Sequence, residues 1–138
     1  MEKSAMKILL FGSKGWIGAQ FKEVCDTLNV ECIAATSRAD NIEAVGKELD
    51  EVKPTHVASF IGRTHGTIGE KEYTTIDYLE QEGKLVENVR DNLFSPLALT
   101  ILCAERGIHY TYLGTGCIFK FDEEHPYGEE KNGFTESS

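Results

Sequence analysis

Three glycines at close spacing form the pattern in this 138-residue chain that points most clearly to chemistry. They lie in the stretch GSKGWIG, residues 12–18, between a short apolar run and a segment with helical periodicity. In such a turn one glycine allows a sharp bend, a second lets the backbone approach a pyrophosphate, and a third lets helix and strand pack closely. The stretch predicts a dinucleotide-binding loop made of Gly12, Lys14, Gly15, Trp16, Ile17 and Gly18. A glycine-rich turn without a ligand is the alternative.

The next informative position lies about twenty residues further on, where dinucleotide sites distinguish their two cofactors. NAD-specific sites place an Asp or Glu there, and its carboxylate accepts a hydrogen bond from the ribose 2′-hydroxyl. This chain has Ser37 and Arg38 instead, with Lys14 as a second cation. A guanidinium suits a 2′-phosphate, so the sequence favours NADP(H) over NAD(H). The alternative is that Arg38 only faces solvent.

A hydroxyl and a thiol stand two residues apart in the stretch LGTGCIF, residues 113–119. This stretch follows an expected strand, and ligands of open parallel sheets bind outside the carboxyl ends of the strands. Thr115 and Cys117 are therefore candidates to meet a bound substrate. For Cys117 the alternative is a small buried residue, as free cysteines usually are.

Seven predicted elements must position these residues. Short apolar runs bounded by Gly or Pro predict strands at residues 6–11, 31–36, 55–61 and 109–113. Apolar residues at steps of three and four predict helices at residues 17–28, 42–52 and 84–106. Strands that alternate with helices imply a parallel sheet covered on both faces. We expect an α/β fold with a doubly wound parallel sheet of Rossmann type, truncated before its last strands and the substrate lobe.

Local signals refine this outline at three places. Asp40 with Glu43 forms a capping-box signature at the start of the second helix. Pro96 predicts a kink or a break within the third helix. Residues 62–83 are weakly patterned, and loops of this length are usually functional or mobile.

Composition bounds the class of protein. We expect residues 1–5 to be an extension, residues 6–119 to form the NADP-binding domain and residues 120–138 to be an acidic loop. The net charge of −9 and the lack of a basic cluster argue against nucleic-acid and membrane partners. No apolar run is long enough for a signal peptide or a membrane span, so a cytoplasmic location is expected. The scattered cysteines and histidines predict free thiols and no metal site.

Four stretches carry a resemblance to a known family: KILLFGSKGWIG, KPTHVASFIGRTHG, NVRDNLFSPL and YLGTGCIF. Together they resemble the extended short-chain dehydrogenase/reductase superfamily, in its dTDP-4-dehydrorhamnose reductase-like branch. Within that branch the chain looks like the bifunctional 3,5-epimerase/4-reductases that make nucleotide-linked L-rhamnose. The resemblance runs through residues 6–135, nearly the whole chain.

This resemblance implies further contacts. It places Phe60, Ile61 and Gly62 against the adenosine and ribose of the cofactor, and it makes Asn92 the helix asparagine that helps to hold the active-site strand. Apart from the resemblance, Arg63, Thr64 and His65 stand just past the third expected strand, a position from which they would reach the substrate or the nicotinamide. A solvated loop is the alternative for these last three residues.

The resemblance also implies catalytic roles. Thr115 matches the Ser or Thr that hydrogen-bonds the sugar C4 oxygen during hydride transfer. Cys117 stands where bifunctional members have cysteine, and a thiol can serve in proton exchange beside a ketone. The Tyr-x-x-x-Lys pair of the superfamily is missing, since Tyr127 and Lys131 match its spacing only, within an acidic loop. We therefore expect this chain alone to be inactive and the true pair to follow Ser138.

The expected function is that of the cofactor-binding portion of an NADP(H)-dependent nucleotide-sugar 3,5-epimerase/4-reductase. Its substrate would be a 4-keto-6-deoxyglucose nucleotide, with uridine or thymidine as the base. The alternative is a non-catalytic regulatory module of the same fold that holds a dinucleotide. A truncated sheet would expose an apolar edge and helix face, which favours self-association, so a homodimer is one expected form.

Overall fold

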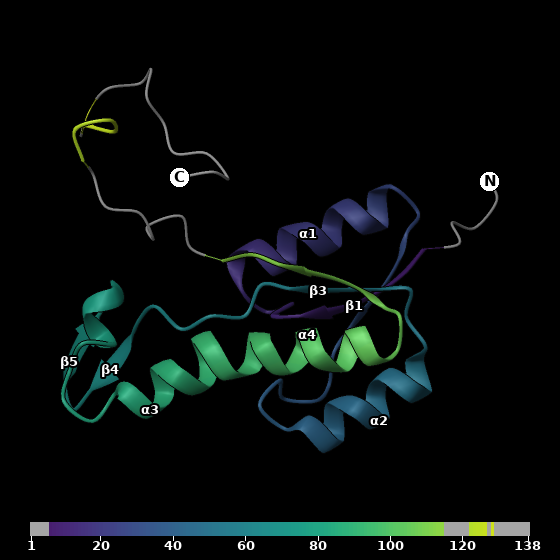
Figure 1. Ribbon diagram of the computed structural model, residues 1–138, viewed down its shortest axis with the longest axis horizontal. Helices are drawn as coiled ribbons and strands as arrows, with labels where there is room; N and C mark the ends of the chain where they lie inside the picture. Colours follow the sequence, from purple (N-terminus) through teal and green to yellow (C-terminus); the bar gives the residue numbers. More distant parts are fainter. Residues whose placement is uncertain (1–5, 115–121, 127, 129–138) are drawn as a thin grey trace.

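A four-stranded parallel sheet forms the centre of the computed structural model, which describes residues 6–114, 122–126 and 128 (Figure 1). Its strands are β1 (Lys7–Phe11), β2 (Glu31–Ala34), β3 (His56–Ser59) and β6 (His109–Tyr112). They stand in the order β2-β1-β3-β6. All four predicted strands are confirmed. Thr115 and Cys117, and the predicted domain boundary at residue 119, lie outside the described residues.

The direction of winding reverses between β1 and β3. The chain first moves from β1 to β2 on one side, and it then crosses back to pair β3 with the other side of β1. Leu9 of β1 therefore lies opposite Ile33 on one side and opposite Val57 on the other. Such a switch point opens a crevice at the carboxyl ends of the strands, because neighbouring connections leave in opposite directions. The doubly wound parallel sheet is confirmed.

Helices cover both faces of this sheet (Figure 1). α1 (Trp16–Thr27) lies on one face, and α2 (Ile42–Val52) and α4 (Ser95–Glu105) lie on the other. The larger core, beneath α2 and α4, includes Leu9, Phe11, Val45, Leu49, Val57, Leu99, Leu102 and Cys103. The smaller core, beneath α1, includes Ile8, Leu10, Cys25 and Ala58. Each large apolar side chain buried here contributes about 1.5–3 kcal/mol.

The start of α2 differs from the predicted capping box. Asn41 is the N-cap, and its side-chain oxygen accepts a hydrogen bond from the backbone N–H of Ala44 at 3.1 Å. Asp40 stands one residue too early to reach that donor. Glu43 pairs with Lys47 at 2.9 Å instead of reaching back to the cap. The prediction that Asp40 caps the helix is therefore wrong, and its carboxylate is left for another role.

The helix predicted over residues 84–106 is a continuous rod in three parts (Figure 1). α3 (Leu85–Asn88) leads into the π-helical segment η2 (Val89–Phe94), which continues into α4. Pro96 lies in the first turn of α4, so the disturbance expected at the proline comes one turn earlier. The reason is that proline has no N–H and its ring crowds the carbonyl four residues before it. The hydroxyl of Ser95 donates to the carbonyl of Arg90 at 2.8 Å within the widened turn.

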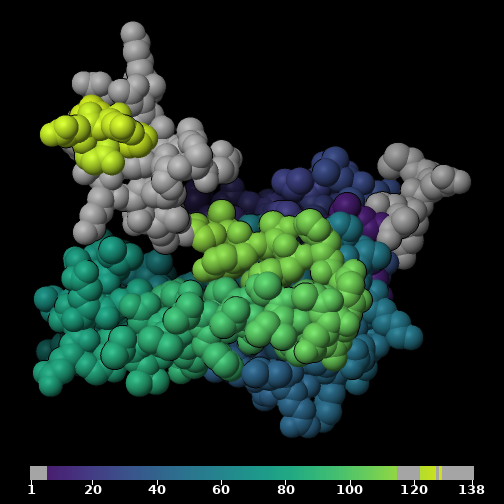
Figure 2. All heavy atoms as spheres, in the orientation of Figure 1, coloured from purple at the N-terminus to yellow at the C-terminus, as the bar shows by residue number. Residues whose placement is uncertain are grey.

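The apolar stripe on this rod faces away from the sheet. The residues that recur every four positions are 40% exposed or more: Leu85, Val89, Leu93, Leu97 and Ile101. The residues of α4 that are buried instead are Ser95, Pro96, Ala98, Leu99, Leu102 and Cys103. The rod lies along the surface in Figure 2. The rod thus exposes an apolar helix face, and the expected self-association stays a prediction.

Residues 62–83 are more regular than their sequence suggests. β4 (Gly66–Ile68) and β5 (Lys71–Tyr73) form an antiparallel hairpin, followed by the short 3₁₀ helix η1 (Ile76–Tyr78). Gly69 makes the hairpin turn with φ of +60°, a conformation that glycine adopts without strain. Tyr78 is buried against Gly66, where an added Cβ would lie 2.6 Å from its ring. The expectation of an unpatterned loop is therefore wrong.

No helix among the described residues is long and apolar enough to cross a membrane.

Candidate functional site

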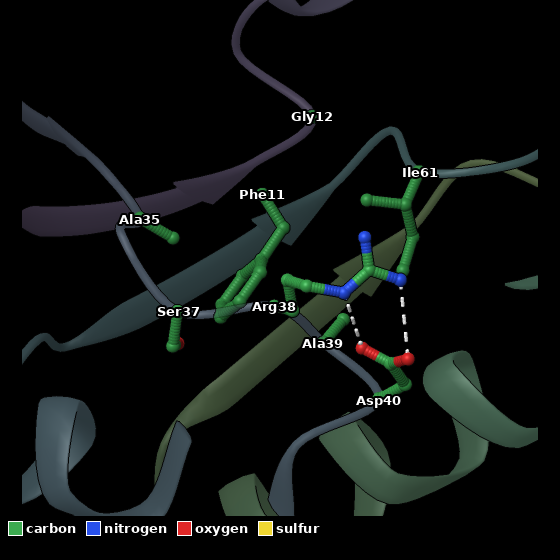
Figure 3. A pocket seen from close by; sticks show the side chains of 8 residues that line it. All are labelled: Phe11, Gly12, Ala35, Ser37, Arg38, Ala39, Asp40 and Ile61. Carbon is green, nitrogen blue, oxygen red and sulfur yellow. Dashed lines mark hydrogen bonds and ion pairs between the residues drawn. The ribbon is translucent and has the colours of Figure 1, made fainter. Parts of the chain in front are cut away.

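Two adjoining pockets lie at the carboxyl ends of β1, β2 and β3. The Arg38 pocket is lined by Phe11, Gly12, Ala35, Ser37, Arg38, Ala39, Asp40 and Ile61 (Figure 3). The Arg63 pocket is lined by Gly12, Gly15, Phe60, Ile61, Gly62, Arg63, Thr64, His65 and Asp91. Gly12 and Ile61 line both, so the two pockets adjoin at the switch point of the sheet, and together they are called the groove.

The glycine loop forms the floor between the two pockets. Gly12 has φ of +82°, and a Cβ there would lie 2.9 Å from the backbone of Phe60. A Cβ on Gly18 would lie only 2.1 Å from the carbonyl oxygen of Gly12. No side chain caps the first turn of α1, whose N-cap is Gly15. The start of this helix is thus bare backbone beside the groove, which is the arrangement that binds phosphate groups.

Nine of the predicted site residues line the groove: Gly12, Gly15, Ser37, Arg38, Phe60, Ile61, Gly62, Arg63 and Thr64. Lys14, Trp16, Ile17, Gly18 and Asn92 do not line it. The side chain of Trp16 is 82% exposed, so only its backbone N–H can serve the loop. His65, which the sequence analysis left open, belongs to the lining.

Arg38 is the most exposed cation of the groove and it already has an anionic partner. Its Nε lies 3.0 Å from Oδ1 of Asp40, and its Nη2 lies 3.1 Å from Oδ2 (Figure 3). Nε of Arg90 lies 3.6 Å from the same Oδ2. The hydrogen bonds from Arg38 lower the pKa of Asp40 below its usual range. Sequence reasoning identified Arg38 but missed this carboxylate.

Ser37 is engaged by a carboxylate from α2. Its backbone N–H and its hydroxyl both donate to Oε2 of Glu48. The N–H and hydroxyl of Thr36 donate to Oε1, at 2.7 and 2.9 Å. Glu48 is only 9% exposed, and it fixes the loop that leaves β2. It was missed by sequence reasoning, although its place on the buried face of α2 between Val45 and Leu49 was a signal.

Asn92 holds the loop that leaves β3. Its Oδ1 accepts from the backbone N–H of Arg63 at 2.8 Å, and its Nδ2 donates to the carbonyl of Arg63 at 3.0 Å. A Cβ on Gly62 would lie 3.4 Å from the same Oδ1. Asn92 thus positions this wall of the groove from behind. The expected contact of Asn92 with the active-site strand stays a prediction.

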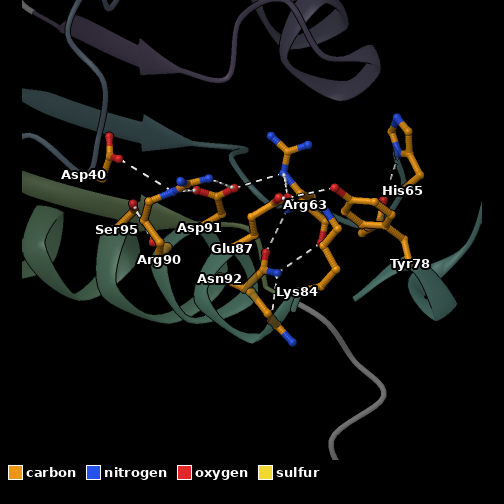
Figure 4. Close-up of polar contacts among 12 residues, drawn as sticks. Asp40, Arg63, His65, Tyr78, Lys84, Glu87, Arg90, Asp91, Asn92 and Ser95 are labelled. Atoms are coloured by element: carbon orange, nitrogen blue, oxygen red, sulfur yellow. Dashed lines mark hydrogen bonds and ion pairs between the residues drawn. The ribbon is translucent and has the colours of Figure 1, made fainter. Parts of the chain in front are cut away.

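A chain of charged contacts runs along the rod behind the groove (Figure 4). Asp91 accepts from Arg90 at 2.7 Å and from Nε of Arg63 at 3.0 Å. Glu87 lies 3.6 Å from the same Nε. The hydrogen bonds from Arg90, and after them those from Arg63, lower the pKa of Asp91. The π-helical turn places Arg90, Asp91 and Asn92 in succession against the two loops, a use common for such turns at functional sites.

The outer nitrogens of Arg63 remain open to the groove. Its Nε carries both contacts to the carboxylates, and the outer nitrogens make no hydrogen bond within the described part of the chain. In Figure 4 they point away from the rod that carries Asp91 and Glu87. The anchored guanidinium is therefore suited to bind an anionic or carbonyl oxygen of a ligand.

Cysteines of the described residues lie away from this groove. Cys103 is buried in the larger core and Cys25 in the smaller one, and Cys32 is half-buried against the smaller core. Burial raises the pKa of Cys103 to about 11, which keeps the thiol protonated and unreactive. No group of three or more His, Cys, Asp or Glu in the part that the structure describes could hold a metal ion.

The parallel sheet, its switch point and the groove across it define a Rossmann-like α/β protein. The chain belongs to the family described as the RmlD substrate binding domain, whose model matches residues 6–133. The predicted family branch is thereby confirmed.

Relatives agree with this assignment. The L780 protein of Acanthamoeba polyphaga mimivirus is 51% identical over 132 residues, which cover 96% of this chain and 44% of L780. The crystal structure of L780, described as a UDP-rhamnose synthase, has a TM-score of 0.81 over 92% of this chain and 42% of that one. A trifunctional Arabidopsis thaliana enzyme, described as dehydratase, 3,5-epimerase and UDP-4-keto-L-rhamnose reductase, is 30% identical over 92% of this chain and 18% of its own length. The chain thus spans less than half the length of these relatives.

Proposed function

We propose that this chain is the cofactor-binding portion of a nucleotide-sugar 3,5-epimerase/4-reductase that makes nucleotide-linked L-rhamnose. The observation that carries the proposal is the groove of two adjoining pockets beside the glycine loop, in a chain 50% identical to a described UDP-rhamnose synthase. The substrate is a 4-keto-6-deoxyglucose nucleotide. Its reduction requires a hydride donor, and the groove has the shape and backbone of a dinucleotide site.

The residues present fit a nicotinamide dinucleotide. No side chain caps the backbone at the start of α1, where a pyrophosphate would bind, and the space at Gly12 and Gly18 admits no Cβ. The Arg38 pocket would hold the adenosine ribose, and the Arg63 pocket would hold the nicotinamide end beside the substrate. When bound, the cofactor supplies the hydride for the C4 ketone. Asn92 and Asp91 keep Arg63 in place to orient the ligand.

The first test measures binding to the 138-residue chain. We expect calorimetric titration with NADPH to show one-to-one binding. We also expect NADPH to bind more tightly than NADH, because Arg38 can contact the 2′-phosphate. A chain that binds neither dinucleotide would contradict the proposed function. A chain that binds the two equally would contradict only the preference.

Arg38→Asp is expected to reverse the order of the two affinities. The guanidinium offers a charge-assisted contact worth about 1.5–3 kcal/mol to a 2′-phosphate, or tenfold or more in affinity. A carboxylate would repel the phosphate and accept from the 2′-hydroxyl of NADH instead. The affinities are compared by calorimetry. Lys47→Asp, which makes the same charge change at an exposed position of α2, should leave the order unchanged.

The catalytic assignments of Thr115 and Cys117 are tested in a protein that contains the whole family fold. Cys117→Ser should reduce solvent deuterium incorporation at C3 and C5 by about 10²-fold or more, the usual contribution of a general acid or base. It should spare reduction of an already epimerised ketone. Thr115→Val should do the reverse, since the hydroxyl serves the C4 oxygen. Unchanged deuterium incorporation in Cys117→Ser would make the thiol structural.

A further inference from the structure

The guanidinium of Arg38 is already occupied by a carboxylate of the same loop. Asp40 follows two residues later and meets Arg38 with both oxygens, at 3.0 and 3.1 Å. This two-point contact is the one that arginine makes with a phosphate. Asp40 does not cap α2, because Asn41 does so. The helix start therefore gives no reason for a carboxylate at position 40.

We propose that Asp40 is a specificity-determining residue of the Arg38 pocket, an internal anion that competes with the 2′-phosphate of the dinucleotide for Arg38. The inference rests on the proposed function, since it concerns the same groove. Asp40 lowers the preference for NADPH that Arg38 alone would produce. Its removal should make the site more selective for the phosphorylated cofactor.

The charges around the pocket support this competition. Arg38 and Arg90 supply two positive charges, and Asp40 and Asp91 supply two negative charges, all linked by contacts of 3.6 Å or less. These four charges sum to zero, and Arg63, Glu87 and Lys84, which continue the chain of contacts from Asp91, bring the total to +1. A 2′-phosphate brings about −1.5 to −2 charges at pH 7. To bind Arg38, the 2′-phosphate must displace the carboxylate of Asp40. The displaced carboxylate then stays close to the phosphate and repels it.

Exposure allows the exchange to happen without unfolding. The side chain of Arg38 is 70% exposed and that of Asp40 is 23% exposed. An ion pair this exposed is weak, because water screens it and two side chains must be ordered to form it. A ligand phosphate can therefore displace the carboxylate at a modest cost. The competition from Asp40 should lower the affinity for NADPH by about five- to tenfold. This effect should become smaller as salt is added.

The experiment compares NADPH and NADH binding to the original chain, Asp40→Asn and Asp50→Asn by calorimetry. We expect Asp40→Asn to bind NADPH about five- to tenfold more tightly, with NADH affinity changed less than twofold. The gain should shrink when the salt concentration rises from 0.05 M to about 0.5 M. Asp50→Asn is the matched control, because it removes one negative charge and an Arg–Asp pair at Arg106, on the far end of α2 and α4. It should leave both affinities unchanged.

A second variant separates competition from a general charge effect. In Arg38→Gln/Asp40→Asn the gain for NADPH should vanish, because no guanidinium remains to be released. Far-ultraviolet circular dichroism checks that each variant is folded, and Asp40→Ser replaces Asp40→Asn if the asparagine variant is not.

The outcomes distinguish the two proposals. If the original chain binds neither dinucleotide, the proposed function fails and this inference fails with it. If it binds both and Asp40→Asn leaves the ratio unchanged, only the inference is overturned. If Asp40→Asn weakens NADH instead, Asp40 is a ligand of the ribose 2′-hydroxyl rather than a competitor, and the inference is likewise overturned.

Discussion

Replacing Gly18 by alanine is expected to abolish dinucleotide binding and to lower the free energy of unfolding by about 3 kcal/mol or more. The added Cβ would lie 2.1 Å from the carbonyl oxygen and 2.8 Å from the carbonyl carbon of Gly12. Gly12 has little room to move aside, since the space next to it is so small that even an added Cβ would lie 2.9 Å from the backbone of Phe60. α1 would therefore have to lift off β1, which displaces the N–H groups that face the groove.

Chemical denaturation measures the loss of stability, and calorimetry with NADPH measures the loss of binding. Gly46→Ala is the matched control. The Cβ at position 46 of α2 would have only the flexible end of Arg106 as its nearest neighbour, at 3.4 Å. Alanine favours a helix over glycine by about 1 kcal/mol. This control should thus be as stable as the original chain or more so. A Gly18→Ala chain with unchanged stability and binding would contradict the close packing of helix and strand at the loop.

The central sheet could be predicted because its strands are short, apolar and buried on both faces. Residues 8–11 of β1 are all buried, so no alternation with polar residues confuses the signal. Pro54 marks the end of the second helical segment, and Gly62 marks the end of the apolar run that forms β3. The alternation of these runs with helical segments then implies a parallel sheet with crossovers of one hand.

The irregular parts escaped prediction for physical reasons. β4 and β5 have three residues each, too few for a period to show, and the contact that holds them is the long-range one between Tyr78 and Gly66. The π-helical turn before Pro96 relieves the clash between the proline ring and the carbonyl four residues earlier. A kink, a break or a widened turn can each relieve this clash, so the sequence alone does not predict which one forms. In the rod, the apolar stripe with a four-residue period faces solvent, so periodicity predicted a helix but not its buried face.

The candidate site was predictable where it depends on glycine and not where it depends on paired charges. The glycine loop follows from sterics that are local in sequence. The N-cap of α2 is Asn41, one residue later than the sequence pattern predicts. Asp40 is therefore free of the helix start and pairs with Arg38. Asp91 meets Arg63 only because the loop that follows β3 lies against η2. The roles of Thr115 and Cys117 stay predictions.

Glu48→Gln is expected to lower the free energy of unfolding at pH 7 by about 2–4 kcal/mol. Glu48 is nearly buried and accepts four hydrogen bonds, two each from Thr36 and Ser37. A glutamine has one oxygen to accept with, and its NH₂ group would face two donors. A part-buried backbone N–H of Thr36 or Ser37 would then face the NH₂ group without an acceptor, which costs more than the loss of an ordinary surface contact. Glu51→Gln on the exposed side of α2 is the control and should have no such effect.

The loss in Glu48→Gln should depend on pH, because the carboxylate works only when ionised. Burial acts to raise the pKa of Glu48, but the hydrogen bonds from Ser37 and Thr36 outweigh it and lower the pKa below its ordinary value of 4.5. A carboxyl whose pKa is lower in the folded chain contributes its full stability above the unfolded-state pKa, and loses it as the pH falls through the lowered value. The difference in unfolding free energy between the original chain and Glu48→Gln should therefore be constant from pH 6 to 8 and shrink below about pH 4.5. Denaturant unfolding of both chains across this range makes the comparison, and a difference that grows on acidification would show that the ionised carboxylate does not hold the β2 loop.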